Sequence, residues 1–122
     1  DTARSRGLGD VYKRQSSNTV KITQRGAGDH RSITDVNGDN NDITVTQRGN
    51  SSSSYSSLTV DNGHTVDLFQ RHGNHTATMN LTNNGGGYNL DVDQTDNNQD
   101  RTYSLTGICN NANGCSVTVT QN

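Results

Sequence analysis

Proline and tryptophan are both absent from this chain of 122 residues, and only 25% of the residues are apolar. So small an apolar fraction excludes a conventional globular core, because too few side chains are available to offset the entropy of ordering the chain. The lack of proline fits extended hydrogen-bonded strands, which a proline would interrupt. No apolar run is long enough to span a membrane. After residue 15 the chain has six basic and ten acidic residues, and this net charge of −4 argues against a nucleic-acid partner.

What the chain does contain is a repeat. A glutamine recurs at intervals of 23, 23, 24 and 27 residues, and an aliphatic residue stands two and four positions before each one. Strict alternation of this kind predicts a half-buried strand with the aliphatic and glutamine side chains on one inner face. The glutamines are Gln24, Gln47, Gln70, Gln94 and Gln121. The aliphatic core residues are Val20, Ile22, Ile43, Val45, Val66, Leu68, Leu90, Val92, Val117 and Val119.

The repeat domain is expected over residues 16–122. Each unit continues from its glutamine through a corner, usually with glycine, a weaker second strand and a turn rich in Asn and Gly. The predicted coils are 18–40, 41–63, 64–87, 88–114 and a partial coil 115–122. They could pair as an antiparallel meander, but the glutamine column favours stacking, because identical amides then form ladders. We therefore predict an all-β fold, a stacked β-solenoid of cross-β type with about 23 residues per coil.

Residues 1–15 share neither the period nor the composition of the rest, and they lack an initiator Met. Their sequence resembles translated sequencing-adapter fragments, so we expect a non-native or disordered segment outside the repeats. A real basic N-terminal arm is the alternative. If the segment is not native, a signal peptide is presumed missing.

The repeat resembles the bacterial curlin repeat, the unit of curli amyloid subunits, whose motif runs approximately Ser-x5-Gln-x-Gly-x2-Asn-x-Ala-x3-Gln. All five glutamines fit its first half, and Gly26 and Gly49 follow their glutamines at the motif spacing. The second half departs, with Asp29, Arg31 and Asp35 at the motif's Asn, Ala and Gln in the first coil. The motif Ser is replaced by Asn18, Asn41, His64, Tyr88 and Cys115.

The resemblance implies a divergent curli-type functional amyloid. Such a protein would be a secreted structural subunit that polymerises end to end with itself into extracellular cell-surface fibres, for biofilm matrix and adhesion. Its implied partners are further copies, a nucleating subunit and secretion machinery. The alternative is a monomeric β-solenoid that serves as a binding or adhesion module of a larger surface protein.

Charged residues next to the strands suggest a role in controlling assembly. Arg25, Arg48 and Arg71 each follow a repeat glutamine, so stacking would place three like charges in a row. Together with Asp29 and Asp35, they are expected to act as gatekeepers that slow uncontrolled pairing. The alternative is a solvated face whose charges contribute little.

Two cysteines, Cys109 and Cys115, flank a short turn, and we expect them to form a disulfide if the protein is exported. No His or acid is placed beside either cysteine by the repeat, so a catalytic thiol is not expected. The four histidines are scattered without a ligand pattern. We predict no metal, no cofactor and no enzymatic activity.

Overall fold

The computed structural model describes residues 2–4, 8–13, 17–26, 29–49, 54–95 and 100–121. Within these ranges all regular structure is β, and no helix could cross a membrane. The strands are β1 (Thr2–Arg4), β2 (Leu8–Lys13), β3 (Thr19–Arg25), β4 (His30–Val36), β5 (Asp42–Arg48), β6 (Ser54–Val60), β7 (Thr65–Arg71), β8 (Thr76–Asn83), β9 (Tyr88–Gln94), β10 (Thr102–Cys109) and β11 (Cys115–Gln121).

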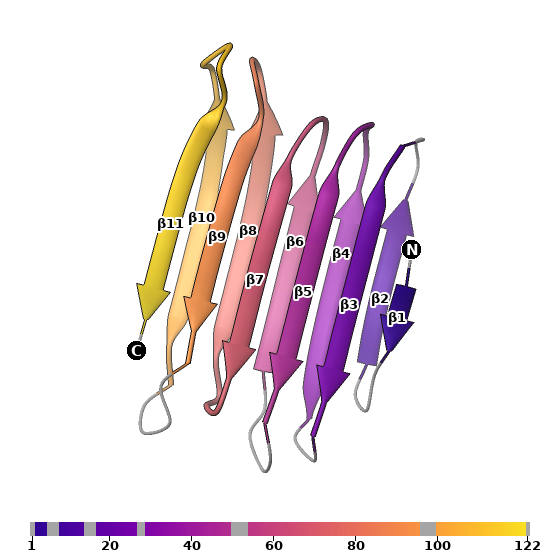
Figure 1. Cartoon of the computed structure of the whole chain (residues 1–122), viewed down its shortest axis with the longest axis vertical. Coiled ribbons are helices and arrows are strands. Elements are labelled where there is room, and N and C mark those ends of the chain that lie inside the picture. The colour runs from indigo at the N-terminus through magenta and orange to yellow at the C-terminus, as the bar shows by residue number, and fades with distance from the viewer. Residues whose placement is uncertain are drawn as a thin grey trace.

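The strands form two parallel sheets. The odd-numbered sheet has the order β1-β3-β5-β7-β9-β11, and the even-numbered sheet has the order β10-β8-β6-β4-β2 (Figure 1). Every strand therefore pairs with the equivalent strand of the neighbouring coil and not with the next strand in sequence. This arrangement confirms the predicted β-solenoid and excludes the antiparallel meander.

The register of the odd-numbered sheet follows the glutamine spacing. Gln24 pairs with Gln47, Gln47 with Gln70, Gln70 with Gln94, and Gln94 with Gln121. In the even-numbered sheet the step varies more, because His30 pairs with Ser54, Tyr55 with Thr76, and Thr76 with Thr102. The turns and corners thus absorb differences in repeat length while the odd-numbered strands remain aligned.

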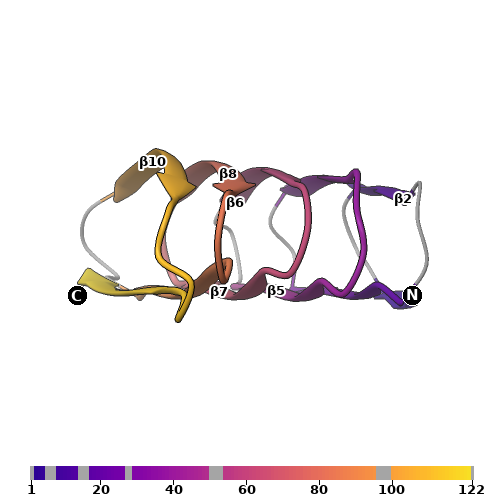
Figure 2. The same cartoon turned by 90° about the horizontal axis from the view of Figure 1, so that it is seen from above.

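The two sheets face each other across a narrow core, and the termini lie at opposite ends of the stack (Figure 2). The odd-numbered sheet supplies the aliphatic residues that precede the glutamines. The even-numbered sheet supplies a second set that the alternation of the first strand does not reveal. This second set comprises Val36, Leu58, Val60, Ala77, Met79 and Leu81.

A glycine corner follows β3, where the backbones of two coils come very close. Gly26 has a φ of 106°, and a Cβ placed there would lie 1.8 Å from the carbonyl oxygen of Gly49. No side chain fits without moving the neighbouring backbone, so the Gly of the Gln-x-Gly motif is a packing requirement as well as a conformational one.

Two strands lie within residues 1–15, which the sequence places outside the repeats. β1 pairs in parallel with β3, from Thr2↔Lys21 to Arg4↔Thr23. β2 pairs with β4 in the same manner, from Leu8↔Arg31 to Lys13↔Val36. Their backbones extend both sheets by one shorter coil. The non-native origin of the segment remains a prediction.

Candidate functional site: the stacking ladders and the charged outer face

The five glutamines form one continuous hydrogen-bonded ladder inside the stack, here called the glutamine ladder. The Nε2 group of each glutamine donates to Oε1 of the glutamine in the next coil. The four distances, from the Gln24–Gln47 bond to the Gln94–Gln121 bond, are 2.7, 2.9, 2.8 and 2.8 Å. Every bond points the same way, so the ladder has a direction from the N-terminal to the C-terminal coil.

A second N–H on the amides that follow Gln24 ties the two sheets together. Nε2 of Gln47 donates to the backbone oxygen of Arg31 at 2.9 Å, and Nε2 of Gln70 donates to that of Tyr55 at 3.2 Å. Nε2 of Gln121 likewise donates to the backbone oxygen of Thr102 at 3.2 Å. The ladder therefore bridges successive coils and opposite sheets with the same atoms, which suits an environment where an unpaired amide is costly.

The aliphatic residues lie on the same inner face as the glutamines. In the four coils from β3 to β9 they are buried, each at most 1% exposed. The last pair, Val117 and Val119, is only half-buried, and Gln121 is half-buried as well. The final coil of the structure thus leaves one side of its core residues uncovered.

A second ladder runs at the other end of the odd-numbered strands, six residues before each glutamine. The side chains of Asn18, Asn41 and His64 each accept a hydrogen bond from the backbone N–H of the next coil. The bonds run from Asn41 N to Asn18 Oδ1 at 3.0 Å, from His64 N to Asn41 Oδ1 at 2.8 Å, and from Tyr88 N to His64 Nδ1 at 3.0 Å. We call this the cap ladder.

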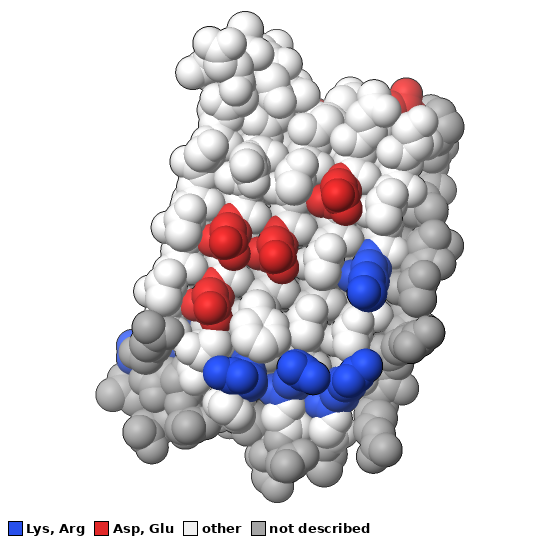
Figure 3. Space-filling view, in the orientation of Figure 1, with Lys and Arg blue, Asp and Glu red and all other residues white. Residues whose placement is uncertain are grey.

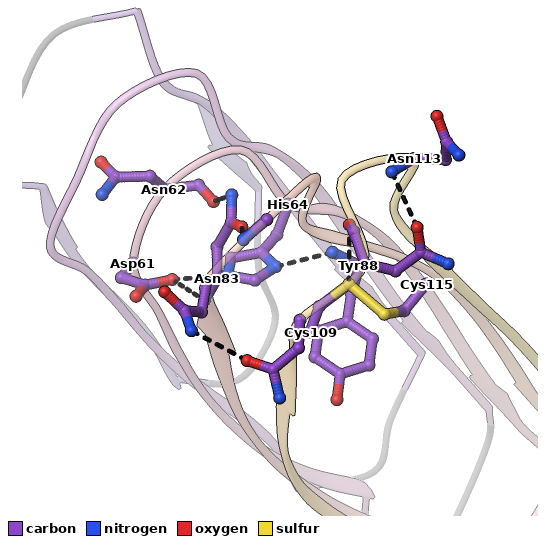
Figure 4. The surroundings of a disulfide bond; sticks show 12 residues. Asp61, Asn62, His64, Asn83, Tyr88, Cys109, Asn113 and Cys115 are labelled. Carbon is purple, nitrogen blue, oxygen red and sulfur yellow. Dashed lines mark hydrogen bonds and ion pairs between the residues drawn. A yellow bond between two sulfur atoms is a disulfide. The ribbon is translucent and has the colours of Figure 1, made fainter.

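His64 takes part in the cap ladder in its neutral form. Its Nδ1 accepts from Tyr88, so the ring proton sits on Nε2, which donates to Oδ1 of Asp61 at 2.7 Å. The same Asp61 oxygen accepts the backbone N–H of Asn83 at 2.8 Å (Figure 4). The sequence signal for the cap ladder is position alone, six residues before each glutamine. Asn and His have in common only a side-chain atom that can accept a hydrogen bond.

The cap ladder ends at a disulfide. Cys109 and Cys115 are bonded, with their Cα atoms 5.8 Å apart, and the bond joins the end of β10 to the start of β11 (Figure 4). Cys115 donates its backbone N–H to the backbone oxygen of Gly87 at 2.9 Å and not to the Tyr88 side chain. The Tyr88 hydroxyl instead packs against Gly107, where a Cβ would lie 2.2 Å away, so a small residue on β10 makes room for the large one on β9.

The outer face of the odd-numbered sheet carries two groups of charge. Arg25, Arg48 and Arg71 are paired in register across β3, β5 and β7, and we call them the arginine row. Figure 3 shows basic side chains lined up along one edge of this face. The other expected gatekeepers lie elsewhere: Asp29 is exposed just before β4, and Asp35 is half-buried on β4.

Acidic side chains gather on the coils nearer the C-terminus (Figure 3). Asp67 and Asp91 are directly opposite each other on β7 and β9, and Asp93 lies on the same face. Partial burial, followed by the charges of Asp91 and Asp93, raises the pKa of Asp67 above its ordinary value of 3.8. Two carboxylates in register therefore oppose the stacking that the ladders favour.

The histidines do not converge on one point. His30 and His75 are buried at the starts of the even-numbered strands and bond to the backbone oxygens of Arg25 and Arg71, whereas His72 is exposed. Among the residues that the structure describes, no three His, Cys, Asp or Glu side chains are grouped as a metal site would require.

The cap ladder makes a prediction about His64. His64→Leu removes the acceptor for Tyr88 N–H and the partner of Asp61, and it should lower the free energy of unfolding by about 1–3 kcal/mol. His64→Asn restores the residue type found at positions 18 and 41 and should cost less than half as much. Urea unfolding followed by circular dichroism measures both, and equal losses would contradict the acceptor role.

The glutamine ladder predicts a dependence on position. Gln70→Ala leaves one N–H of Gln47 Nε2 and the Oε1 atom of Gln94 without a partner in a buried site, so it should cost about 3 kcal/mol in unfolding free energy. Gln121 is half-buried and bonds to only one other glutamine, so Gln121→Ala should lower the unfolding free energy by only about 1 kcal/mol. The same unfolding experiment tests this order. Similar costs at the two positions would show that the side chains do not act as a ladder.

The acidic column predicts a pH effect. Because the folded-state pKa of Asp67 is raised, its contribution to stability decreases as pH rises from about 3.8 through that pKa. Asp67→Asn should therefore increase stability at pH 7 by about 0.5 kcal/mol at low salt, with no gain near pH 3. Asp42→Asn is the control, since its neighbours in the sheet are Thr19 and Thr65. A gain for Asp67→Asn that is independent of pH would contradict the electrostatic cause.

Comparison with known proteins agrees with this geometry. Residues 16–49 match the curlin associated repeat, a stretch that includes Gln24, Gln47 and the close-packed glycine corner between them. No curated protein and no solved structure matches the chain. The ladder residues of the matched stretch recur in register through the later coils. The comparison therefore identifies residues 16–49 as similar to the curlin associated repeat.

Proposed function

We propose that this protein is a structural subunit, not an enzyme, and that copies of it stack end to end into an extracellular curli-like amyloid fibre of a biofilm matrix. The observation that carries the proposal is the directional glutamine ladder. Each coil offers the next one the same in-register amide, aliphatic side chains and strand edge, so equivalent coils of two molecules could stack in the same way.

The coil formed by β10 and β11 carries apolar side chains at the positions that are buried between coils in the rest of the stack. Tyr103, Leu105, Val117 and Val119 are partly buried and pack against the core on one side only. The preceding coil at the same positions holds Ala77, Met79, Leu90 and Val92, each at most 1% exposed. Covering the last coil with another would bury apolar surface at a gain of roughly 25 cal/mol per Å².

The addition of a further coil would also supply hydrogen-bond partners for backbone and side-chain amide groups. Inner glutamines use one N–H for a backbone oxygen and the other for the next glutamine, as Gln47 and Gln70 do. Gln121 makes the first kind of bond to Thr102, so a further coil would supply an acceptor for the second. A head-to-tail contact of this type does not close on itself and generates a filament.

Export is supported by the disulfide. A bond between Cys109 and Cys115 persists in an oxidising compartment such as the cell exterior. A secreted location at the cell surface, a role in adhesion, a nucleating subunit and secretion machinery as partners belong to the same proposal. They are supported by the similarity of residues 16–49 to the curlin associated repeat.

Assembly kinetics of the 122-residue chain test the proposal. The chain should form thioflavin-positive fibres after a lag, with X-ray fibre-diffraction reflections at about 4.7 Å and about 10 Å. Gln121→Ala should slow elongation about tenfold although its effect on monomer stability is small, because the variant removes a group at the growing end. Thr120→Ala changes an exposed neighbour on the opposite face and should assemble like the wild type.

Two results would overturn the proposal. A chain that keeps its β signal and stays monomeric at high concentration would favour a binding module of a larger surface protein. Equal elongation rates for Gln121→Ala and Thr120→Ala would show that the glutamine ladder does not continue between molecules.

A further inference from the structure

The arginine row is an arrangement that stacking by itself does not explain. Arg25, Arg48 and Arg71 stand directly above one another because their strands are paired in register. At the spacing of neighbouring strands, about 4.8 Å, the outer two lie about 10 Å apart. Like charges placed opposite each other destabilise a sheet, so the row opposes the fold that positions it.

No ion pair within the part of the chain that the structure describes relieves this repulsion. None of the three guanidinium groups forms an ion pair with a carboxylate in the described part of the chain. The fourth coil ends the row, because Thr95 follows Gln94 where the earlier coils have an arginine. Three adjacent cations therefore face outward from one short edge.

The row lines a groove. Arg25, Arg48 and Arg71, together with three residues of the corner that follows them, line an open, shallow groove of about 310 Å³. The corner residues are Gly26, Gly49 and His72. The two glycines carry no side chain, so the groove is bounded by backbone on one side and by the three arginine side chains on the other.

Two further details distinguish the third coil, at one end of the groove. His72 stands where the earlier coils have Gly26 and Gly49, and it adopts a left-handed φ of 73°, which is unfavourable for a residue with a side chain. Nε of Arg71 is buried without a hydrogen-bond partner, and the Arg71 guanidinium lies 5.5 Å from the Phe69 ring, which limits its movement. Backbone strain at His72 and an unpaired Nε atom on Arg71 therefore occur at adjacent residues of the third coil.

We propose that this groove binds a single acidic polysaccharide chain through its carboxylate groups, with about one arginine for each coil that the chain crosses. A guanidinium donates two parallel N–H bonds to a carboxylate, and a linear row of such forks suits a linear polymer of carboxylates. His72 extends the set of donors at the end of the row. The site lies within one molecule and is therefore independent of fibre formation.

The surrounding charge favours a narrow polyanion of moderate charge density. Asp67, Asp91 and Asp93 lie on the same outer face (Figure 3). A DNA duplex carries one charge per about 1.7 Å of its axis and is much wider than the row, so part of its backbone would face these carboxylates. A single polysaccharide chain can lie along the arginine row and avoid them.

Titration of fluorescent oligogalacturonate with the full chain, followed by anisotropy, tests the proposal. Arg48→Gln, in the middle of the row, should weaken binding about tenfold, and raising NaCl from about 50 mM to about 200 mM should weaken binding to the wild type. Arg31→Gln is the matched control, because Arg31 is exposed on β4 in the opposite sheet and its loss changes the net charge equally. His72→Gly should weaken binding about threefold while leaving the fold at least as stable, since it removes the positive-φ strain.

Three results would overturn the assignment. Equal affinities for Arg48→Gln and Arg31→Gln would show attraction by overall charge only. A duplex or single-stranded oligonucleotide that binds through the row as tightly as oligogalacturonate would replace the polysaccharide with nucleic acid. If oligogalacturonate does not bind and Arg48→Gln instead changes the sedimentation of the protein alone, the row is a contact between copies of this chain.

Discussion

A carboxamide buried between two sheets must satisfy two N–H donors and one acceptor oxygen, and this constraint governs the whole stack. A glutamine can meet it when an identical glutamine lies one strand above and another lies one strand below, with a backbone carbonyl opposite. That condition fixes the parallel pairing and the register of the odd-numbered strands. It also explains why repeat length varies in the turns and corners, where a change does not displace the ladder.

The cap ladder obeys a looser rule. Only an acceptor atom at the right height is needed for the backbone N–H of the next coil, so Asn18, Asn41 and His64 serve equally well. Each replacement then requires an adjustment nearby. The ring of His64 is matched by Asp61, and the bulk of Tyr88 is matched by Gly107 across the core. Variable positions of the repeat are thus coupled to partners in neighbouring strands.

The fold could be predicted from the sequence because a single column, that of the glutamines, sets both the period and the inner face. The even-numbered sheet was harder to predict in detail. Its inner face includes Ser32 and Ser56, whose hydroxyl groups bond to each other at 2.8 Å, and buried Thr34. Inner positions held by Ser or Thr give no hydrophobic alternation in the sequence. For the same reason the sequence did not reveal the cap ladder, whose members differ in chemistry and share only their position.

In a stacked repeat, a surface residue that recurs in every coil forms a column, as the core residues do. Any charged position that is repeated becomes a column of like charges, and most columns of the outer face avoid this by mixing residues. The column that begins at Lys21 continues with Thr44, Asp67, Asp91 and Thr118, so only one adjacent pair repels. The arginine row keeps one charge through three coils although neutral alternatives would stabilise the sheet. A uniform column that costs stability points to a ligand, whereas a mixed column is sufficiently explained by solvation.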